Sequence, residues 1–174
     1  KYFGTDGVRG VAGMHPMTAG FAFRLGVALA EGLRHEGTAA PHVVVGMDTR
    51  RSGPMLAHAA SAGLSSRGAT VTWLGIVPTP GTSYLTTALG ADAGLMVSAS
   101  HNPFDDNGLK IFNRQGEKLS DGLETDIESL IDSDPETLAP VVGGAVGSAS
   151  RYRTQDGHYV EHLLSYAPYL DGLR

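Results

Sequence analysis

The segment 98–110, Ser-Ala-Ser-His-Asn-Pro-Phe-Asp-Asp-Asn-Gly-Leu-Lys, concentrates the side chains of this sequence that are best suited to chemistry. A serine hydroxyl is a weak nucleophile that needs a neighbouring base or a positive field, and a phosphoryl group in transfer needs cations around its oxygens. The segment supplies these groups together, which favours phosphoryl transfer at a serine. Its two hydroxyls, imidazole, amide and ammonium group belong to Ser98, Ser100, His101, Asn102 and Lys110.

Other interpretations of the same segment remain open at this point. A long turn whose Ser, Asn and Asp side chains cap their own backbone explains the composition equally well. Acyl transfer fits less well, because no Gly-x-Ser-x-Gly elbow surrounds Ser100 and His101 is too close in sequence to act as an ordinary triad partner. The sequence also lacks a Walker loop and the Gly-x-Gly-x-x-Gly pattern.

Two further clusters combine glycine or aspartate with arginine. Residues 3–10, Phe-Gly-Thr-Asp-Gly-Val-Arg-Gly, allow close backbone approach to a ligand, and Arg9 has the fork geometry that grips a phosphate. Without further context, a glycine-rich turn with Arg9 in a surface ion pair is the favoured interpretation. Asp48 and Arg50 follow an apolar run, and we expect them to form a structural ion pair.

The pattern His158-Tyr-Val-Glu-His162 matches the His-x-x-Glu-His arrangement of some zinc enzymes. Too few residues follow it to supply a third ligand, and a chain with 7 histidines produces such a pair easily by chance. A solvated helix face is therefore the preferred interpretation of His158 and His162.

Composition limits the possible partners and compartments. The formal net charge of −5 argues against nucleic acid or an anionic membrane surface as a partner, since both need a basic face. With 0 cysteines there is no disulfide framework or catalytic thiol, so a reducing cytoplasm is the simplest location. No apolar run approaches the roughly 20 residues that span a bilayer.

Helical and strand patterns alternate along the chain and predict an α/β fold, with a mostly parallel mixed sheet flanked by helices. In such sheets ligands bind beyond the carboxyl ends of the strands, and segment 98–110 leaves such an end. The expected helices run from Thr18 to Gly37, from Ser52 to Gly68 and over 83–89, and the expected strands cover 42–47, 70–74 and 93–97.

The second half predicts a hairpin, a helix and a change of domain. Residues 109–112 and 117–119 flank the turn 113–116 and indicate a hairpin on the sheet edge, followed by a helix that Ser120 caps. Pro, Gly, Ala and Ser then dominate, which indicates a linker before a last helix over 154–166. We predict an α/β domain over 1–133, a linker over 134–151 and the start of a second α/β domain over 152–174.

The motifs 98–110 and 4–10, in this order, resemble those of the α-D-phosphohexomutase family. The resemblance implies that Ser100 is the phosphoserine, with Arg9 and Lys110 lining the reacting phosphate and His101 beside it. It also implies the first domain of that family as the fold of residues 1–133. Asn102 and Ser98 are assigned to phosphate binding, and Ser98 could partly substitute for Ser100.

Within this family, the amino-acid sequences of both motifs resemble those of the branch that acts on glucosamine phosphates. They are less similar to the motifs of the branches that act on mannose or glucose phosphates. The implied reaction converts glucosamine 6-phosphate to glucosamine 1-phosphate, a precursor of cell-wall amino sugars. Glucosamine 1,6-bisphosphate would be the intermediate and activator. Mannose or glucose phosphate as substrate, and a non-catalytic dimerisation module, remain the alternatives.

The resemblance also implies Mg²⁺, bound by the phosphate on Ser100 and by an Asp-Gly-Asp-x-Asp loop of a second domain. That loop is absent from these 174 residues, as are the family's sugar-contacting and terminal phosphate-binding loops. We therefore expect the sequence to be the front part of a longer protein, with a phosphosugar substrate, a possible homodimer and little turnover as an isolated chain.

Overall fold

A six-stranded mixed sheet lies at the centre of the computed structural model, which describes residues 2–4, 7–153 and 157–166. The strand order is β1-β5-β4-β2-β3-β6. Neighbours among β4, β2, β3 and β6 pair in parallel, whereas β5 runs antiparallel to both β1 and β4. The strands are β1 (Val8–Val11), β2 (His42–Met47), β3 (Thr70–Ile76), β4 (Ala93–Val97), β5 (Asp106–Asn113) and β6 (Ala149–Arg151).

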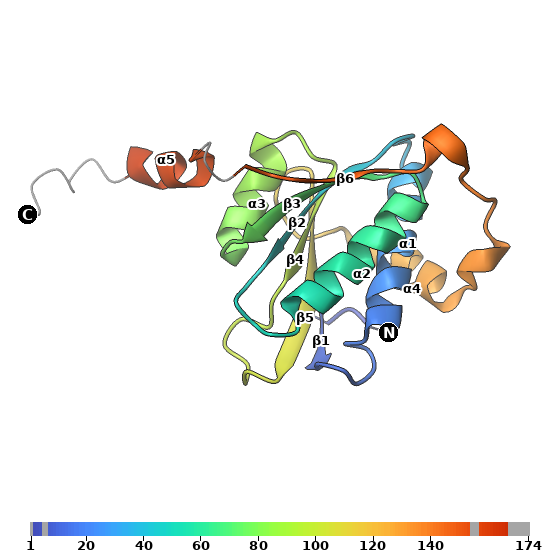
Figure 1. Cartoon of the computed structure of the whole chain (residues 1–174), viewed down its shortest axis with the longest axis horizontal. Coiled ribbons are helices and arrows are strands. Elements are labelled where there is room, and N and C mark those ends of the chain that lie inside the picture. The colour runs from blue at the N-terminus through green and yellow to red at the C-terminus, as the bar shows by residue number, and fades with distance from the viewer. Residues whose placement is uncertain (1, 5–6, 154–156, 167–174) are drawn as a thin grey trace, which may run out of the picture.

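Helices cover both faces of this sheet, which confirms the predicted fold class (Figure 1). On one face lie α1 (Ala19–His35), α2 (Gly53–Ser66) and α4 (Asp121–Asp132). The other face carries α3 (Thr79–Ala88), and α5 (His158–Ser165) contacts α3 at the end of the described chain. Within the described residues, no helix is both long and apolar enough to cross a bilayer.

The helix ends follow from local hydrogen bonding that the sequence predicts. Thr18 caps α1 by accepting a hydrogen bond from the Phe21 N–H, and Ser120 caps α4 by accepting one from Leu123. The predicted helix over 83–89 starts too late, since α3 begins at Thr79, directly after Pro78. Proline favours this position because its fixed φ suits a helix start and its missing N–H is not needed there.

The apolar residues of the parallel strands are buried on both faces, as expected for a sheet between two helical layers. Val43 and Val45 belong to the larger core with α1, α2 and α4, while Val44 lies with Leu74 and Leu85 in a smaller core beneath α3. Successive side chains of β2 therefore point to opposite faces of the sheet, so this one strand contributes to both cores.

The first two helices approach each other closely because glycines face each other's backbone. A Cβ on Gly26 would meet the carbonyl oxygen of Ala60, and a Cβ on Gly63 would meet that of Phe23. This close approach fixes α2 against α1. It thereby also fixes the beginning of α2, which lies beside the loop that follows β4.

The amino-terminal segment is attached to α4. The backbone N–H groups of Tyr2 and Phe3 both donate to Glu128 at 2.7 Å, and the Tyr2 hydroxyl donates to Asp132 at 2.6 Å. That last hydrogen bond is the main reason the pKa of Tyr2 is raised, because it stabilises the protonated phenol. These contacts place the segment that leads into β1.

The predicted hairpin is present only as a turn with one bridge, and its predicted place on the sheet edge is wrong. β5 lies inside the sheet, between β1 and β4, and residues 117–119 contribute only the isolated bridge between Phe112 and Lys118. The partner on the outer side of β5 is β1, where Val8 pairs with Leu109. Such a pairing between distant parts of the chain leaves no local signal. Leu119 turns instead into the core beside α4.

The predicted linker contains some regular structure. Two 3-10 turns occur at Pro135–Thr137 and Gly143–Ala145, and β6 extends the sheet by pairing in parallel with β3. The division at 133 and 151 stays a prediction. The predicted last helix is observed as α5, and residues 154–156 of the predicted span lie outside the described residues.

The close packing of α1 on α2 generates a stability prediction. We expect Gly26→Ala to lower the free energy of unfolding by about 1–3 kcal/mol, because the added methyl overlaps the Ala60 carbonyl. Gly20→Ala is the matched control in the same helix, since nothing lies within 4 Å of its added Cβ. Urea unfolding of both variants measures the difference, and equal stabilities would contradict the packing argument.

Candidate functional site

The candidate site lies where the parallel strands end. Met47 and Val97 pair at the ends of β2 and β4, so Asp48 and Ser98 come side by side in the loops that follow. Ile76 ends β3 next to Met47. A hollow of about 620 Å³ opens at this edge. Its lining residues, which come from the loops after β2 and β4 and from the start of α3, include Arg50, Arg51, Thr79, Ser100 and Phe104.

Ser100 has an unusual backbone conformation. Its φ is 57°, and it is the one non-glycine residue with a positive φ in the described part of the chain. The left-handed conformation costs a residue with a Cβ about 1–2 kcal/mol. Ser100 is exposed, and its Oγ lies 3.4 Å from Nδ1 of His101. Neighbouring interactions must hold this serine, because the conformation is unfavourable in isolation.

Both peptide groups of Ser100 are held by side chains. The Ser100 N–H donates to the hydroxyl of Ser98 at 3.0 Å, and the Ser100 carbonyl accepts from Nη2 of Arg50 at 2.9 Å. Ser98 is thus occupied by the backbone of Ser100. This contact offers a structural role for Ser98, beside the phosphate binding that the sequence predicts.

Asp48 connects these two holding groups. Its Oδ2 accepts from the Ser98 hydroxyl at 2.7 Å and from Nε of Arg50 at 3.0 Å. The ion pair expected between Asp48 and Arg50 is confirmed. Hydrogen bonds to charged groups contribute about 1.5–3 kcal/mol each, so this network offsets the backbone strain at Ser100.

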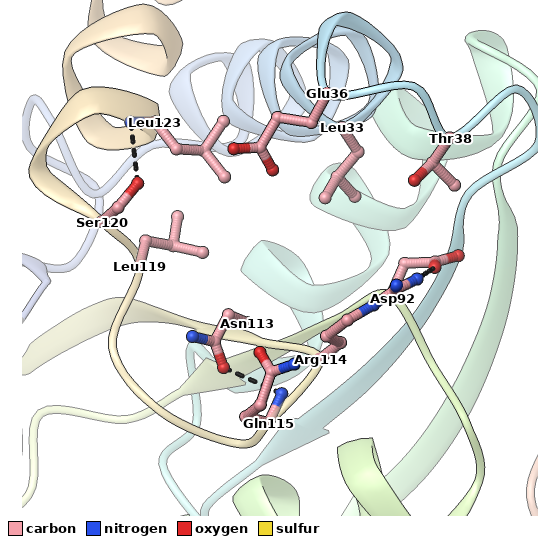
Figure 2. Close-up of a pocket in the computed structure, with 10 residues that line it drawn as sticks. All are labelled: Leu33, Glu36, Thr38, Asp92, Asn113, Arg114, Gln115, Leu119, Ser120 and Leu123. Atoms are coloured by element: carbon pink, nitrogen blue, oxygen red, sulfur yellow. Dashed lines mark hydrogen bonds and ion pairs between the residues drawn. The ribbon is translucent and has the colours of Figure 1, made fainter.

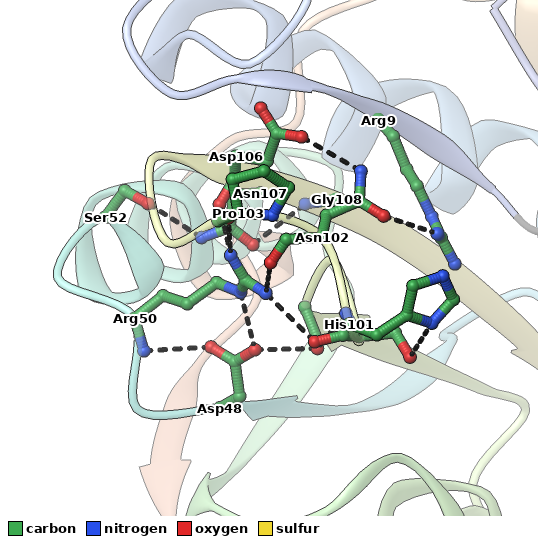
Figure 3. A network of polar contacts seen from close by, with 12 residues as sticks. Arg9, Asp48, Arg50, Ser52, His101, Asn102, Pro103, Asp106, Asn107 and Gly108 are labelled. Carbon is green, nitrogen blue, oxygen red and sulfur yellow. Dashed lines mark hydrogen bonds and ion pairs between the residues drawn. The ribbon is translucent and has the colours of Figure 1, made fainter.

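Arg50 uses all of its side-chain donors in this network (Figure 3). Besides Asp48, its guanidinium donates to four backbone carbonyls of the loop after β4, and its side chain is only 11% exposed. The loop therefore wraps around a single cation. The four carbonyls belong to Ser100, Asn102, Pro103 and Asp106.

Arg9 reaches the same loop from β1. Its Nη1 donates to Oδ1 of Asn102 at 3.3 Å, and the Asn102 amide donates to Asp106 at 2.9 Å (Figure 3). Arg9 pairs with Gly108 across the β1–β5 ladder, where a Cβ on Gly108 would lie 2.6 Å from the Ser98 carbonyl oxygen. Arg9 and Asn102 thereby lie together at the serine loop, and their role in phosphate binding stays a prediction.

Lys110 shares the sheet face of Arg9 and lies near the ring of Phe112. Side chains alternate along a strand, so Gly108, Lys110 and Phe112 of β5 lie on the face where Arg9 pairs with Gly108. The Lys110 Nζ lies 5.3 Å from the ring centroid of Phe112. Its predicted place beside the phosphate stays a prediction, whereas His101, Asn102 and Arg9 are positioned near Ser100.

Asn107 is a site residue that the sequence analysis missed. It is fully buried, and its amide donates to the Ser52 hydroxyl at 2.8 Å while its carbonyl oxygen accepts from the Gly108 N–H at 2.8 Å. This residue joins the start of β5 to the start of α2. The available signal was an amide directly before a glycine at the start of an otherwise apolar strand pattern.

The electrostatics at this edge favour an anion. Both α2 and α3 begin here, after β2 and β3, and Thr79 of α3 lines the hollow. The amino-terminal ends of helices carry partial positive charge and unpaired N–H groups that attract phosphates. Arg51 adds a cation to the lining.

A second pocket, of about 310 Å³, lies at the opposite end of the sheet (Figure 2). Asp92 precedes β4 there and forms an ion pair with Arg114 at 2.7 Å. Asp92 also accepts from the His42 N–H. Leu33, Leu119 and Glu36 form much of the remaining wall (Figure 2). These contacts hold the beginnings of β2 and β4 together, at the end of the sheet away from the serine loop.

The two histidines of the zinc-like pattern make aromatic and hydrogen-bonding contacts. Nδ1 of His158 lies 2.8 Å from the Tyr152 hydroxyl, and the His162 ring stacks on Tyr84 with centroids 3.8 Å apart. The predicted solvated face is thus partly covered by α3. Within the described residues, no group of three or more potential metal-ligating side chains occurs anywhere.

Comparison with known proteins bears on the family of this chain. Residues 1–138 match the family model described as phosphoglucomutase/phosphomannomutase, alpha/beta/alpha domain I. The chain belongs to this phosphohexomutase family. The match covers β1 to β5, the serine loop and α4, and it confirms the resemblance inferred from motifs 4–10 and 98–110.

Named relatives of this phosphohexomutase chain are phosphoglucosamine mutases. Those from Deinococcus deserti and Deinococcus radiodurans are each 52% identical over 100% of the chain, and that of Macrococcus caseolyticus is 51% identical over 95%. The chain spans 39% of the length of both Deinococcus proteins and 37% of the Macrococcus protein.

Solved structures share the fold. A Thermus thermophilus protein described as a phosphomannomutase aligns with a TM-score of 0.77 and 32% identity, over 94% of this chain and 35% of that one. A phosphoglucomutase/phosphomannomutase family protein from Burkholderia thailandensis aligns with a TM-score of 0.72 and 30% identity, over 91% and 34% of the two chains.

The buried contact between Asn107 and Ser52 generates a second prediction. We expect Asn107→Ala to lower the free energy of unfolding by about 1–3 kcal/mol, because it leaves buried polar groups without their partner. A double-mutant cycle with Ser52→Ala should give a coupling energy of about 1 kcal/mol. Strict additivity in urea unfolding would show that the two residues do not hold the loop together.

Proposed function

We propose that this chain is the nucleophile-bearing domain of a phosphoglucosamine mutase, which interconverts glucosamine 6-phosphate and glucosamine 1-phosphate. The observation that carries the proposal is Ser100, an exposed serine held in a left-handed turn at an edge that favours anions. The names of relatives at about half identity support the choice of glucosamine phosphate. These relatives are much longer than this chain, so the activity is proposed for the full-length protein.

The proposed reaction exchanges phosphate between Ser100 and the sugar. The bond from phosphorus to the Ser100 oxygen breaks while a bond to a sugar hydroxyl oxygen forms. The proton of that hydroxyl ends on the Ser100 oxygen, which leaves Ser100 as a neutral hydroxyl. Glucosamine 1,6-bisphosphate then turns over, and its other phosphate returns to Ser100. On return the Ser100 hydroxyl loses its proton, and Nδ1 of His101, at 3.4 Å, is within reach to accept it.

Two cationic side chains are proposed to bind the phosphate while it is transferred. Arg9, which contacts the serine loop through Asn102, and Lys110 on the same sheet face are proposed to pair with its oxygens. Ser98 is proposed to hold the loop, with any phosphate contact secondary, because its hydroxyl already contacts both Asp48 and Ser100. A phosphorylated Ser100 would carry about −1.5 to −2 charge.

Mg²⁺ is the proposed cofactor. A phosphate on Ser100 offers the hard oxygen donors that Mg²⁺ prefers, and this ion usually binds through phosphates and few protein ligands. The described residues contain no three-residue acidic or histidine cluster, so further protein ligands are expected from other parts of the full-length protein. When bound, the ion would neutralise charge on the transferring phosphoryl group.

The proposed function has two alternatives: a mutase that acts on another sugar phosphate, and a non-catalytic dimerisation module. The Thermus thermophilus neighbour is described as a phosphomannomutase, which keeps mannose and glucose phosphates as candidates. Competition between sugar phosphates on the full-length protein decides among them. A homodimer and a cytoplasmic location stay predictions. Sedimentation of this chain tests the dimer: a stable dimer supports the assembly role, and a monomer removes it.

Phosphosite mapping tests the proposed nucleophile. After incubation of the full-length protein with glucosamine 1,6-bisphosphate and Mg²⁺, we expect mass spectrometry to find phosphate on Ser100, and added glucosamine 6-phosphate should remove it. Ser100→Ala should lower turnover at least about a thousandfold, because no other nucleophile is equally placed. A folded protein with Ser100 unmodified under both conditions would refute the proposal.

Ser98→Ala is the matched control for the same experiment. We expect it to keep phosphate on Ser100 and to lower turnover by about tenfold, since one charge-assisted contact of the loop is lost. Phosphate appearing on Ser98 in the Ser100→Ala variant would instead support the substitute role that the sequence suggested.

The isolated chain should bind or turn over substrate poorly. We predict turnover at least about a hundredfold below that of the full-length protein, because proposed metal and sugar contacts come from outside these 174 residues. A coupled assay for glucosamine 1-phosphate formation measures both proteins at equal concentration. Comparable rates would show that this domain contains the complete site.

A further inference from the structure

We propose that Asp48 and Arg50 are positioning residues, which hold the backbone of Ser100 so that its hydroxyl faces the hollow after β4. The inference rests on the proposed role of Ser100 as the phosphate-carrying serine. It assigns a function to an ion pair that the sequence alone presents as structural.

One carboxylate, that of Asp48, holds both peptide groups of Ser100 through two other side chains. The Ser100 N–H is held by Ser98, and the Ser100 carbonyl is held by Arg50. Ser98 and Arg50 are both bound in turn by the same Oδ2 atom of Asp48, at 2.7 and 3.0 Å. A displacement of Asp48 therefore affects the φ and ψ of Ser100 together.

The forked shape of the arginine side chain suits it to holding several carbonyls at once. Its planar guanidinium provides five donors in a fixed fork, whereas lysine provides three on a flexible stem. Arg50 directs one donor to Asp48 and the other four to the carbonyls of Ser100, Asn102, Pro103 and Asp106. Lysine would keep the charge at this position but could not hold four carbonyls and Asp48 in one plane.

The planarity of the peptide bond determines where the N–H groups of the loop point. In a trans peptide the N–H points opposite to the carbonyl, so the His101 N–H points away from Arg50 when the Ser100 carbonyl points toward it. The same holds for the Phe104 N–H, since the Pro103 carbonyl also faces Arg50. Arg50 thus turns the positive ends of these peptide dipoles outward, to the side of the loop away from its own charge.

The contacts of Arg50 fit a positioning role better than substrate binding. Arg50 directs its side-chain donors to Asp48 and the loop, and its side chain is only 11% exposed. It therefore acts on the geometry of the phosphate donor. Loss of Arg50 should lower kcat strongly and change KM for glucosamine 6-phosphate little, because the transfer step depends on in-line alignment.

The test compares Arg50→Met, Arg50→Lys and Asp48→Asn in the full-length protein. Arg114→Met is the matched control, because Arg114 also forms an ion pair with an aspartate but lies at the opposite end of the sheet, where Asn113 pairs with the first residue of β4. Each variant is charged with glucosamine 1,6-bisphosphate, its Ser100 phosphate is quantified, and transfer to glucosamine 6-phosphate is followed in a single turnover. Steady-state kcat, KM and Tm complete the comparison.

We expect kcat and the single-turnover rate to fall about a hundredfold in Arg50→Met and about tenfold in Arg50→Lys and Asp48→Asn. KM should stay within about threefold, and Arg114→Met should keep wild-type rates. Because lysine keeps the positive charge, the part of the rate that Arg50→Lys recovers measures the contribution of charge. The part that it does not recover measures the contribution of the forked guanidinium. Each rate is divided by the amount of phosphorylated Ser100, so that incomplete phosphorylation of a variant does not lower its apparent rate.

Wild-type transfer rates in a folded Arg50→Met variant would overturn the inference, as would a rise in KM with unchanged kcat. If Arg50→Met does not fold, the milder Arg50→Lys decides: a tenfold lower kcat supports positioning, and a wild-type kcat refutes it. Failure of the proposed function has a different signature, namely wild-type protein that never carries phosphate on Ser100.

Discussion

A single carboxylate oxygen, Oδ2 of Asp48, is the point on which the geometry of the serine loop depends. It receives the Ser98 hydroxyl and the Arg50 guanidinium, and these two groups hold both peptide groups of Ser100. Because the left-handed backbone of Ser100 is unfavourable on its own, it persists only where such bonds compensate for it. The partly buried ion pair and the exposed nucleophile are therefore parts of one structure.

The sheet topology makes that network possible. Parallel pairing of β2 with β4 brings Asp48 beside Ser98, and the antiparallel entry of β1 on the outer side of β5 brings Arg9 to the same loop. The close contact of α1 with α2 fixes the helix start at Ser52, to which Asn107 is bonded. Packing far from the site thus determines how accurately the loop is held.

Local patterns predicted most of the elements correctly, because their causes are local. Side-chain caps at Thr18 and Ser120 and continuous apolar runs such as 42–47 each leave a signal within a few residues. The position of β5 was predicted incorrectly, since its outer partner β1 lies about a hundred residues earlier. Likewise, β6 escaped notice because three exposed residues carry no hydrophobic period.

The sequence by itself determined the fold class, the family and the loop that carries Ser100, since these depend on periodicity and on motifs that can be read in order. Tertiary structure alone decided which residues hold that loop. Asp48 and Arg50 lie fifty residues before Ser98 and Ser100, and their contacts follow from strand register. Hydrogen bonds between distant segments depend on how the strands align, and no spacing along the chain records that alignment.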